Sequence, residues 1–211
     1  GDKPDPTMPA PAVDAVSLAR HEARFGRSWY SAEYTVPGQS APLVVIVVNS
    51  QILNSGLAAE VRQARWLEAE LPNRKSQGAR LVLALHLPPF LHEADEPGLG
   101  HYDNIAAPAR GWLLALLRRF PVELLLAGHV HWAFSGQLHG AAYRIAPSTS
   151  FTRPGFGHLF ASGPAPERGR DDAPKLGFLL CRVFADRIDV HTVRTGGLEE
   201  GADDPTGERL A

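Results

Sequence analysis

The chain has 211 residues, 44% of them hydrophobic, which is enough for one well-buried domain and too much for a largely disordered chain. With 21 basic and 23 acidic side chains the formal net charge is −2, so the composition excludes a polybasic nucleic-acid binder. No apolar run reaches the roughly 18 residues of a membrane span. The single cysteine, Cys181, excludes an internal disulfide framework and a zinc site built from cysteines.

The hydrophobic pattern predicts helices and strands that alternate through most of the chain. The expected elements are helices over 13–25, 57–71 and 106–120 and strands over 29–34, 43–48, 80–86 and 122–127. The continuous apolar run over 43–48 is typical of a strand buried on both faces. In the helix over 57–71, Leu57, Val61, Ala64 and Leu67 share one face, and Pro72 is expected to end it. The element order predicts an α/β fold with crossover connections.

The pattern changes after Trp132, where short β segments separated by glycines replace the helices. These segments are expected over 133–138, 141–145, 177–184 and 188–193. Residues 1–195 are therefore predicted to form one domain. Residues 196–211 carry five acidic side chains against one arginine, which predicts a disordered, solvated tail.

Histidines follow two of the predicted strands. His86 ends the strand over 80–86, and His129 and His131 follow the strand over 122–127 in the sequence Gly-His-Val-His. Ligands gather at the carboxyl ends of strands in an α/β sheet, and alternate residues of an extended backbone point to the same side. Three imidazoles that converge there could bind zinc, iron or manganese. The alternative is that each histidine is a hydrogen-bonded loop residue.

Two further polar features lie near the same strand ends. The loop over 87–105 is long and polar, which predicts that it overhangs the site, with His92, Asp95 and Tyr102 as substrate-binding residues. The alternative is a solvated surface loop. Asn49, at the end of the strand over 43–48, is interpreted as a capping group rather than a site residue.

Several short motifs resemble a known superfamily. Leu-His-Leu-Pro-Pro over 85–89 and Gly-His-Val-His over 128–131 resemble the last two signature boxes of the calcineurin-like metallophosphoesterases. The segments over 25–31, 48–51 and 63–67 resemble the branch that contains calcineurin-like phosphoesterase domain-containing protein 1. The resemblance covers about residues 1–195 and implies a four-layer αββα sandwich, in which two sheets are flanked by helices.

The resemblance also implies an activity. Members of the superfamily hydrolyse phosphate esters at a site with two divalent ions, such as manganese, iron, zinc or magnesium, which activate a bridging water. By resemblance, His86 and His129 would bind one ion and His131 the other. The histidine that assists the leaving group in the superfamily has no counterpart in this chain, so no catalytic residue is assigned.

Three earlier boxes of the superfamily are missing from their expected places. They are the Asp-x-His pair, the Gly-Asp-x-x-Asp motif and the Gly-Asn-His box. Asp189-Val190-His191 has the Asp-x-His spelling but lies in the predicted final hairpin. We therefore expect the C-terminal part of a metallophosphoesterase without its N-terminal strands, active only as the full-length protein. It should expose a sheet edge and dissolve poorly on its own. The alternative is a degenerate, non-catalytic domain that acts as a binding or scaffold module.

Overall fold

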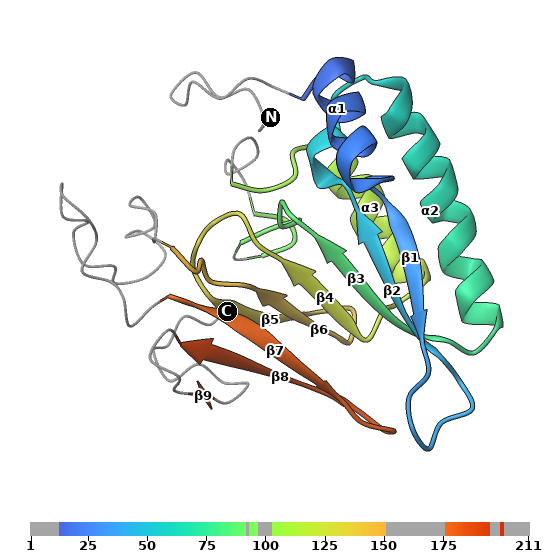
Figure 1. Ribbon diagram of the computed structural model, residues 1–211, viewed down its shortest axis with the longest axis vertical. Coiled ribbons are helices and arrows are strands. Elements are labelled where there is room, and N and C mark those ends of the chain that lie inside the picture. The colour runs from blue at the N-terminus through green and yellow to red at the C-terminus, as the bar shows by residue number, and fades with distance from the viewer. Residues whose placement is uncertain (1–12, 92, 97–102, 151–175, 195–198, 201–211) are drawn as a thin grey trace.

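The computed structural model describes residues 13–91, 93–96, 103–150, 176–194 and 199–200 (Figure 1). The elements follow the predicted order. They are α1 (Ala15–Phe25), β1 (Tyr30–Tyr34), β2 (Leu43–Val48), the short 3-10 helix η1 (Ser50–Ile52), α2 (Ala58–Ser76), β3 (Arg80–Leu85), α3 (Ala109–Arg119), β4 (Leu124–Ala127), β5 (Phe134–Leu138), β6 (Ala141–Ile145), β7 (Gly177–Val183), β8 (Ile188–Arg194) and β9 (Glu199–Glu200).

The strands form two sheets. The larger has the order β1-β2-β3-β4-β6-β5, and the smaller has the order β7-β8-β9. In the larger sheet β2, β3, β4 and β6 run parallel, while β1 and β5 pair antiparallel at its edges. Within the described residues this gives three of the four expected layers, namely helices, large sheet and small sheet. The predicted α/β class is confirmed.

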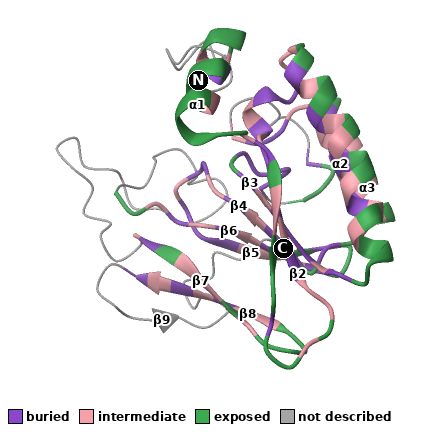
Figure 2. Cartoon of the chain, turned by 45° about the vertical axis from the view of Figure 1, so that its right-hand side comes forward, coloured by how far each residue is buried: buried purple, intermediate pink, exposed green. Residues whose placement is uncertain are grey.

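The large sheet is buried on both faces. Val44 and Ile46 of β2 belong to the main core beneath α2 and α3, whereas Leu43 of β2 and Val190 of β8 belong to a second core between the sheets. The alternation along β2 explains its unbroken apolar sequence, because each face needs its own set of hydrophobic side chains. By contrast, α1 is mostly exposed, with Leu18 as the buried residue among those described (Figure 2).

The buried face of α2 differs from the prediction. The helix buries Ala59, Gln63, Leu67 and Leu71, whereas Val61 is 51% exposed. Gln63 is buried because its side chain accepts a hydrogen bond from the backbone N–H of Asn49 (2.8 Å) and donates one to the Asn49 carbonyl (3.0 Å). A hydrophobic pattern misses a polar residue that is buried in this way.

The prediction that Pro72 ends this helix is wrong. The helix continues through Pro72 to Ser76. Proline near the end of a helix removes one backbone hydrogen bond and leaves only a single turn beyond it, so the cost is limited. The chain instead turns at Gly78, which has a φ of +72°, and the N–H of Ala79 donates to the carbonyl of Arg74.

The small sheet is fixed to the large sheet at one end by Arg80. Its guanidinium forms a salt bridge with Glu123 (2.7 Å) and donates hydrogen bonds to the carbonyls of Phe184 and Ala185 in the β7–β8 turn. The hydrogen bond with Glu123 raises the pKa of Arg80. Near the other end, the N–H of Gly177 donates to the carbonyl of Ser148. The strand β7 is therefore held near one end by the large sheet and at the other end by the segment that follows β6.

Other predictions concern the chain ends and surface. Glu199–Glu200 pairs with β8 as β9, so part of the predicted disordered tail is a strand; the rest of 196–211 lies outside the described residues. Among the described strands, β1, β5, β7 and β9 lie at the ends of their sheets. An edge exposed by missing strands and poor solubility both stay predictions. In the described part of the chain no helix is long and apolar enough to cross a membrane.

Candidate functional site

The carboxyl ends of β3 and β4 bring two of the predicted histidines together. These strands are neighbours and run parallel, with Ala84 opposite Leu126. His86 follows β3 and His129 follows β4, so their side chains meet at the same edge of the sheet. His86 Nε2 lies 3.0 Å from His129 Nδ1, and the rings are edge to face with centroids 4.9 Å apart.

The two rings differ in their exposure to solvent. His129 is 8% exposed, whereas His86 is exposed and lines an open pocket. The backbone keeps the two strand ends close, because the N–H of Gly128 donates to the carbonyl of His86 (3.0 Å). A solvent ligand can therefore reach the pair from the side of His86.

The backbone between His129 and His131 is not extended, contrary to the reasoning that placed both side chains on one side. His129 and His131 have φ angles of +73° and +68°, in the left-handed region, and the N–H of Val130 donates to the carbonyl of Gly128. Val130 is fully buried in the main core, and this packing holds the turn in place. Non-glycine residues with positive φ are uncommon and cluster at functional sites.

The segment after β2 supports His86 from the opposite wall. Ser50 is 1% exposed, and its Oγ accepts a hydrogen bond from the N–H of Leu87 (2.7 Å). Asn49 Oδ1 accepts from the N–H of Gln51, and its Nδ2 donates to Ser28 Oγ. Asn49 therefore caps η1, the 3-10 helix that follows the strand, and it also lines the pocket that contains His86.

The loop that follows His86 is anchored by a buried carboxylate. Glu96, 6% exposed, accepts hydrogen bonds from the N–H of Leu91 (2.9 Å) and from the side-chain amide of Asn104. Tyr143 of β6 donates its hydroxyl hydrogen to the carbonyl of Phe90 (2.7 Å). Burial and the nearby Glu96 charge raise the pKa of Tyr143 well above its usual value.

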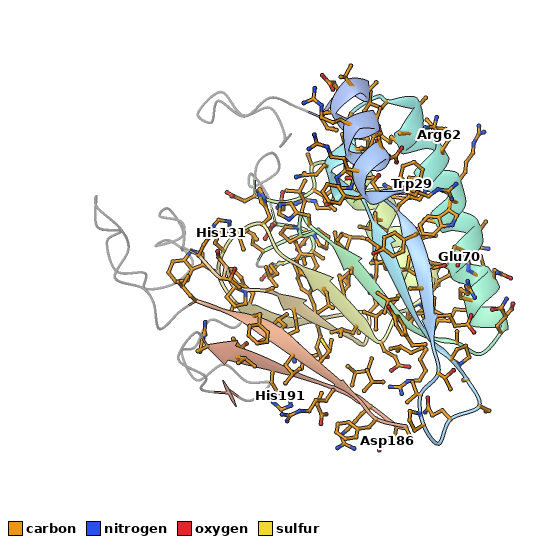
Figure 3. The ribbon with its side chains drawn as sticks, viewed as in Figure 1. Trp29, Arg62, Glu70, His131, Asp186 and His191 are labelled. Carbon is orange, nitrogen blue, oxygen red and sulfur yellow. The ribbon has the colours of Figure 1, made fainter. Side chains whose placement is uncertain are left out.

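The predicted substrate-binding residues of this loop are only partly placed. Asp95 is exposed, while His92 and Tyr102 lie outside the described residues. The Asp-x-His spelling at 189–191 lies in the final hairpin, where Asp189 pairs with Arg187 at 3.1 Å, and His191 is far from His131 (Figure 3). This agrees with its interpretation as a hairpin feature.

The two histidines form a pair rather than a complete set of metal ligands. In the part of the chain that the structure describes, no group of three or more His, Cys, Asp or Glu side chains could hold a metal ion. His86 Nε2 and His129 Nδ1 lie at the distance of a hydrogen bond, and the tautomers of the two rings decide which one donates.

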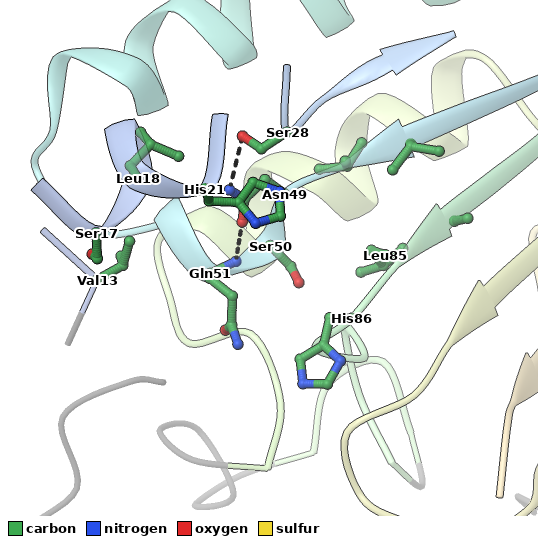
Figure 4. Close-up of a pocket in the computed structure, with 13 residues that line it drawn as sticks. Val13, Ser17, Leu18, His21, Ser28, Asn49, Ser50, Gln51, Leu85 and His86 are labelled. Atoms are coloured by element: carbon green, nitrogen blue, oxygen red, sulfur yellow. Dashed lines mark hydrogen bonds between the residues drawn. The ribbon is translucent and has the colours of Figure 1, made fainter. Parts of the chain in front are cut away.

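A pocket of about 500 Å³ opens beside His86, between α1 and the carboxyl ends of β2 and β3 (Figure 4). His21 and Ser28 line it, although the sequence analysis assigned neither residue to a site. Ser28 lies in the family-like segment over 25–31, but no pattern assigned either residue to a site, because α1 approaches the ends of β2 and β3 only in the folded chain.

Comparisons with known proteins give one sequence relative and several structural ones. No protein-family model matches the sequence. The chain is 32% identical over 131 residues to a cAMP/cGMP dual specificity phosphodiesterase of Mycobacterium tuberculosis. The matched region covers 62% of this chain and 36% of that protein. The chain therefore spans little more than a third of the length of this relative.

Two solved structures are similar to the chain at low sequence identity. The GAP50 anchor in the inner membrane complex of Plasmodium matches with a TM-score of 0.59 and 17% identity, covering 83% of this chain and 55% of that one. A dimetal phosphatase from Danio rerio matches with a TM-score of 0.48 and 16% identity, covering 90% and 64%. The first of these likenesses supports the arrangement of sheets and helices described above.

Proposed function

We propose that the chain belongs with the calcineurin-like metallophosphoesterases and is the histidine-bearing part of a metal-dependent phosphoesterase. The observation that carries the proposal is the contact between His86 and His129 at the carboxyl edge of the sheet, 3.0 Å between ring nitrogens. The identity with a cyclic-nucleotide phosphodiesterase suggests a phosphate ester as the substrate.

Each described residue of the site has a defined task in this proposal. His86 and His129 bind an ion, and His131 is assigned to a second ion by resemblance. Ser50 fixes the backbone that follows His86, and the left-handed turn fixes His129. Divalent metal in such a site lowers the pKa of a bound water and neutralises phosphate charge, which makes attack on an anionic ester possible.

We further propose that the carboxylate ligands come from polypeptide beyond this sequence. Two cations that lie close together repel each other, and neutral imidazoles supply no negative charge to offset that repulsion. No carboxylate of the described residues forms a ligand group with these imidazoles. The complete gene product should then hydrolyse p-nitrophenyl phosphate in the presence of Mn²⁺, while residues 1–211 alone should show little or no turnover. Mn²⁺-dependent turnover by this chain alone would contradict the need for outside ligands.

In the described part of the chain no carboxylate completes a ligand group with the pair, which also favours a second candidate, a degenerate domain that binds without catalysis. The coding sequence upstream discriminates between the two. If the upstream sequence encodes the Asp-x-His, Gly-Asp-x-x-Asp and Gly-Asn-His boxes, the degenerate domain is excluded. If the upstream sequence lacks these boxes, the phosphoesterase is excluded.

Metal binding tests the site itself. Titration of Co²⁺ or Mn²⁺ by calorimetry should show one ion bound to the wild-type chain. His129→Ala should weaken binding by about 10-fold or more, because a direct ligand is lost. His191→Ala is the matched control, since it removes an imidazole from the outer hairpin. Equal affinity in both variants would show that His129 is not a ligand.

A further inference from the structure

Gln63 holds the segment that follows β2 from the buried face of α2. The side chain is fully buried, and its amide bonds both backbone groups of Asn49, the N–H at 2.8 Å and the carbonyl at 3.0 Å. An amide carries an acceptor and donors on one planar group, so it can satisfy an N–H and a carbonyl of the same residue together. A hydrophobic side chain at this position would take both bonds away from Asn49.

The residue after Asn49 extends this restraint to β3. Ser50 is buried, and its Oγ accepts a hydrogen bond from the N–H of Leu87 at 2.7 Å. Leu87 is fully buried and directly follows His86. Asn49, Ser50 and His86 line the same pocket at the carboxyl edge of the sheet (Figure 4). The amide of Gln63 is therefore connected to the peptide group after His86 through two consecutive residues.

The peptide group between His86 and Leu87 is held from both sides. The N–H of this group donates to Ser50 Oγ on the side of β2, and the carbonyl accepts from the N–H of Gly128 on the side of β4, at 3.0 Å. The strands β2 and β4 are the two neighbours of β3 in the sheet. Because a peptide group is planar, bonds to both of its ends restrict its rotation and so restrict where the His86 side chain can lie.

The position of the His86 ring depends on this backbone restraint. The ring of His129 is almost completely buried, whereas His86 is exposed, so packing restricts His86 less than His129. The two rings nevertheless lie with His86 Nε2 only 3.0 Å from His129 Nδ1. A binding group has to be held within about 0.5 Å of its working position, and at His86 the held peptide group supplies part of that precision.

We propose that Gln63 is a positioning residue for His86. Through Asn49 and Ser50 it holds the peptide group after His86, and with it the His86 ring, against His129. The inference rests on the proposed function only for the use of His86 as a metal ligand, because the positioning depends on the hydrogen bonds described above. If Gln63 served only to stabilise the domain, its loss would have no separate effect at Leu87.

Amide hydrogen exchange, followed by NMR at about pH 5, separates a local effect from a global one. In Gln63→Leu the amide of Leu87 should exchange at least about 10-fold faster than in the wild type, relative to the amide of Leu83 within β3. Leu67→Ala is the matched control, since Leu67 is buried on the same helix, and it should speed both amides together. An unchanged ratio in folded Gln63→Leu would overturn the proposal.

Gln63→Glu tests whether a side chain of the same shape restores the position. A neutral carboxyl group also has an acceptor and a donor, and burial favours the neutral form at this pH. The Leu87 ratio should therefore return to within about 3-fold of the wild type. If Gln63→Leu fails to fold, Gln63→Asn replaces it, because the shorter side chain cannot reach both groups of Asn49. A ratio in Gln63→Glu as high as in Gln63→Leu or Gln63→Asn would overturn the proposal.

A titration with Co²⁺ links the positioning to the proposed function. Gln63→Leu should weaken binding by about 10-fold or more, as the loss of a residue that supports a ligand does, and Leu67→Ala should leave it unchanged. If the wild type binds no Co²⁺, the phosphoesterase proposal fails and the exchange ratio still decides the positioning. If Gln63→Leu binds Co²⁺ as tightly as the wild type, the positioning is overturned and the phosphoesterase proposal stands.

Discussion

Ser50→Ala removes the hydrogen bond that joins the end of β2 to the residue after His86. Ser50 Oγ accepts from the N–H of Leu87 at 2.7 Å, and the two residues are 1% and 0% exposed. The variant takes away the acceptor of a buried N–H, because alanine has no hydroxyl oxygen. Such a loss costs about 1–3 kcal/mol.

Urea unfolding followed by tryptophan fluorescence measures this cost. In a domain of this size each kcal/mol also lowers Tm by about 2–4 °C. Ser76→Ala is the matched control, because Ser76 is exposed and donates only to the carbonyl of Asn73. The control should stay within about 0.5 kcal/mol of the wild type. If Ser50→Ala destabilises the chain no more than Ser76→Ala does, the buried bond does not fasten the His86 segment.

Two further predictions concern the core. The pKa of Tyr143 is raised by burial, so its contribution to stability is complete below the usual tyrosine pKa of 10.0 and is lost as the pH rises above it. Unfolding at alkaline pH should therefore be less pH-dependent in Tyr143→Phe than in the wild type or in the exposed-edge control Tyr34→Phe. In urea unfolding, Leu67→Ala should lower the free energy of unfolding by about 2–5 kcal/mol and Val61→Ala by less than about 0.5 kcal/mol. Equal losses would show that Val61 is buried as deeply as Leu67, as the sequence pattern predicts.

The strands were predictable because their signal is local. The run over 43–48 is β2, and the helices and later strands lie within a few residues of their expected bounds. The face of α2 was not predictable, because Gln63 is buried through hydrogen bonds to Asn49, a residue that precedes the helix by several positions. The exit of the same helix depends on Gly78 rather than Pro72, and both residues carry turn signals in the sequence.

The candidate site was predictable in part for a similar reason. His86 and His129 follow adjacent parallel strands, so the sheet order alone brings them together. The turn between His129 and His131 depends on the burial of Val130, which no short motif reveals. The pocket beside His86 needs α1 to approach the ends of β2 and β3, and that approach is a property of the whole fold.

The left-handed backbone at His129 and His131 has a consequence for how this chain can be varied. A residue with a Cβ in that conformation costs about 1–3 kcal/mol, and glycine relieves most of it. Variants selected only for heat resistance should therefore accumulate glycine at both positions and lose both imidazoles. A library built to stabilise the protein would therefore have to hold these two codons constant in order to keep the proposed metal ligands.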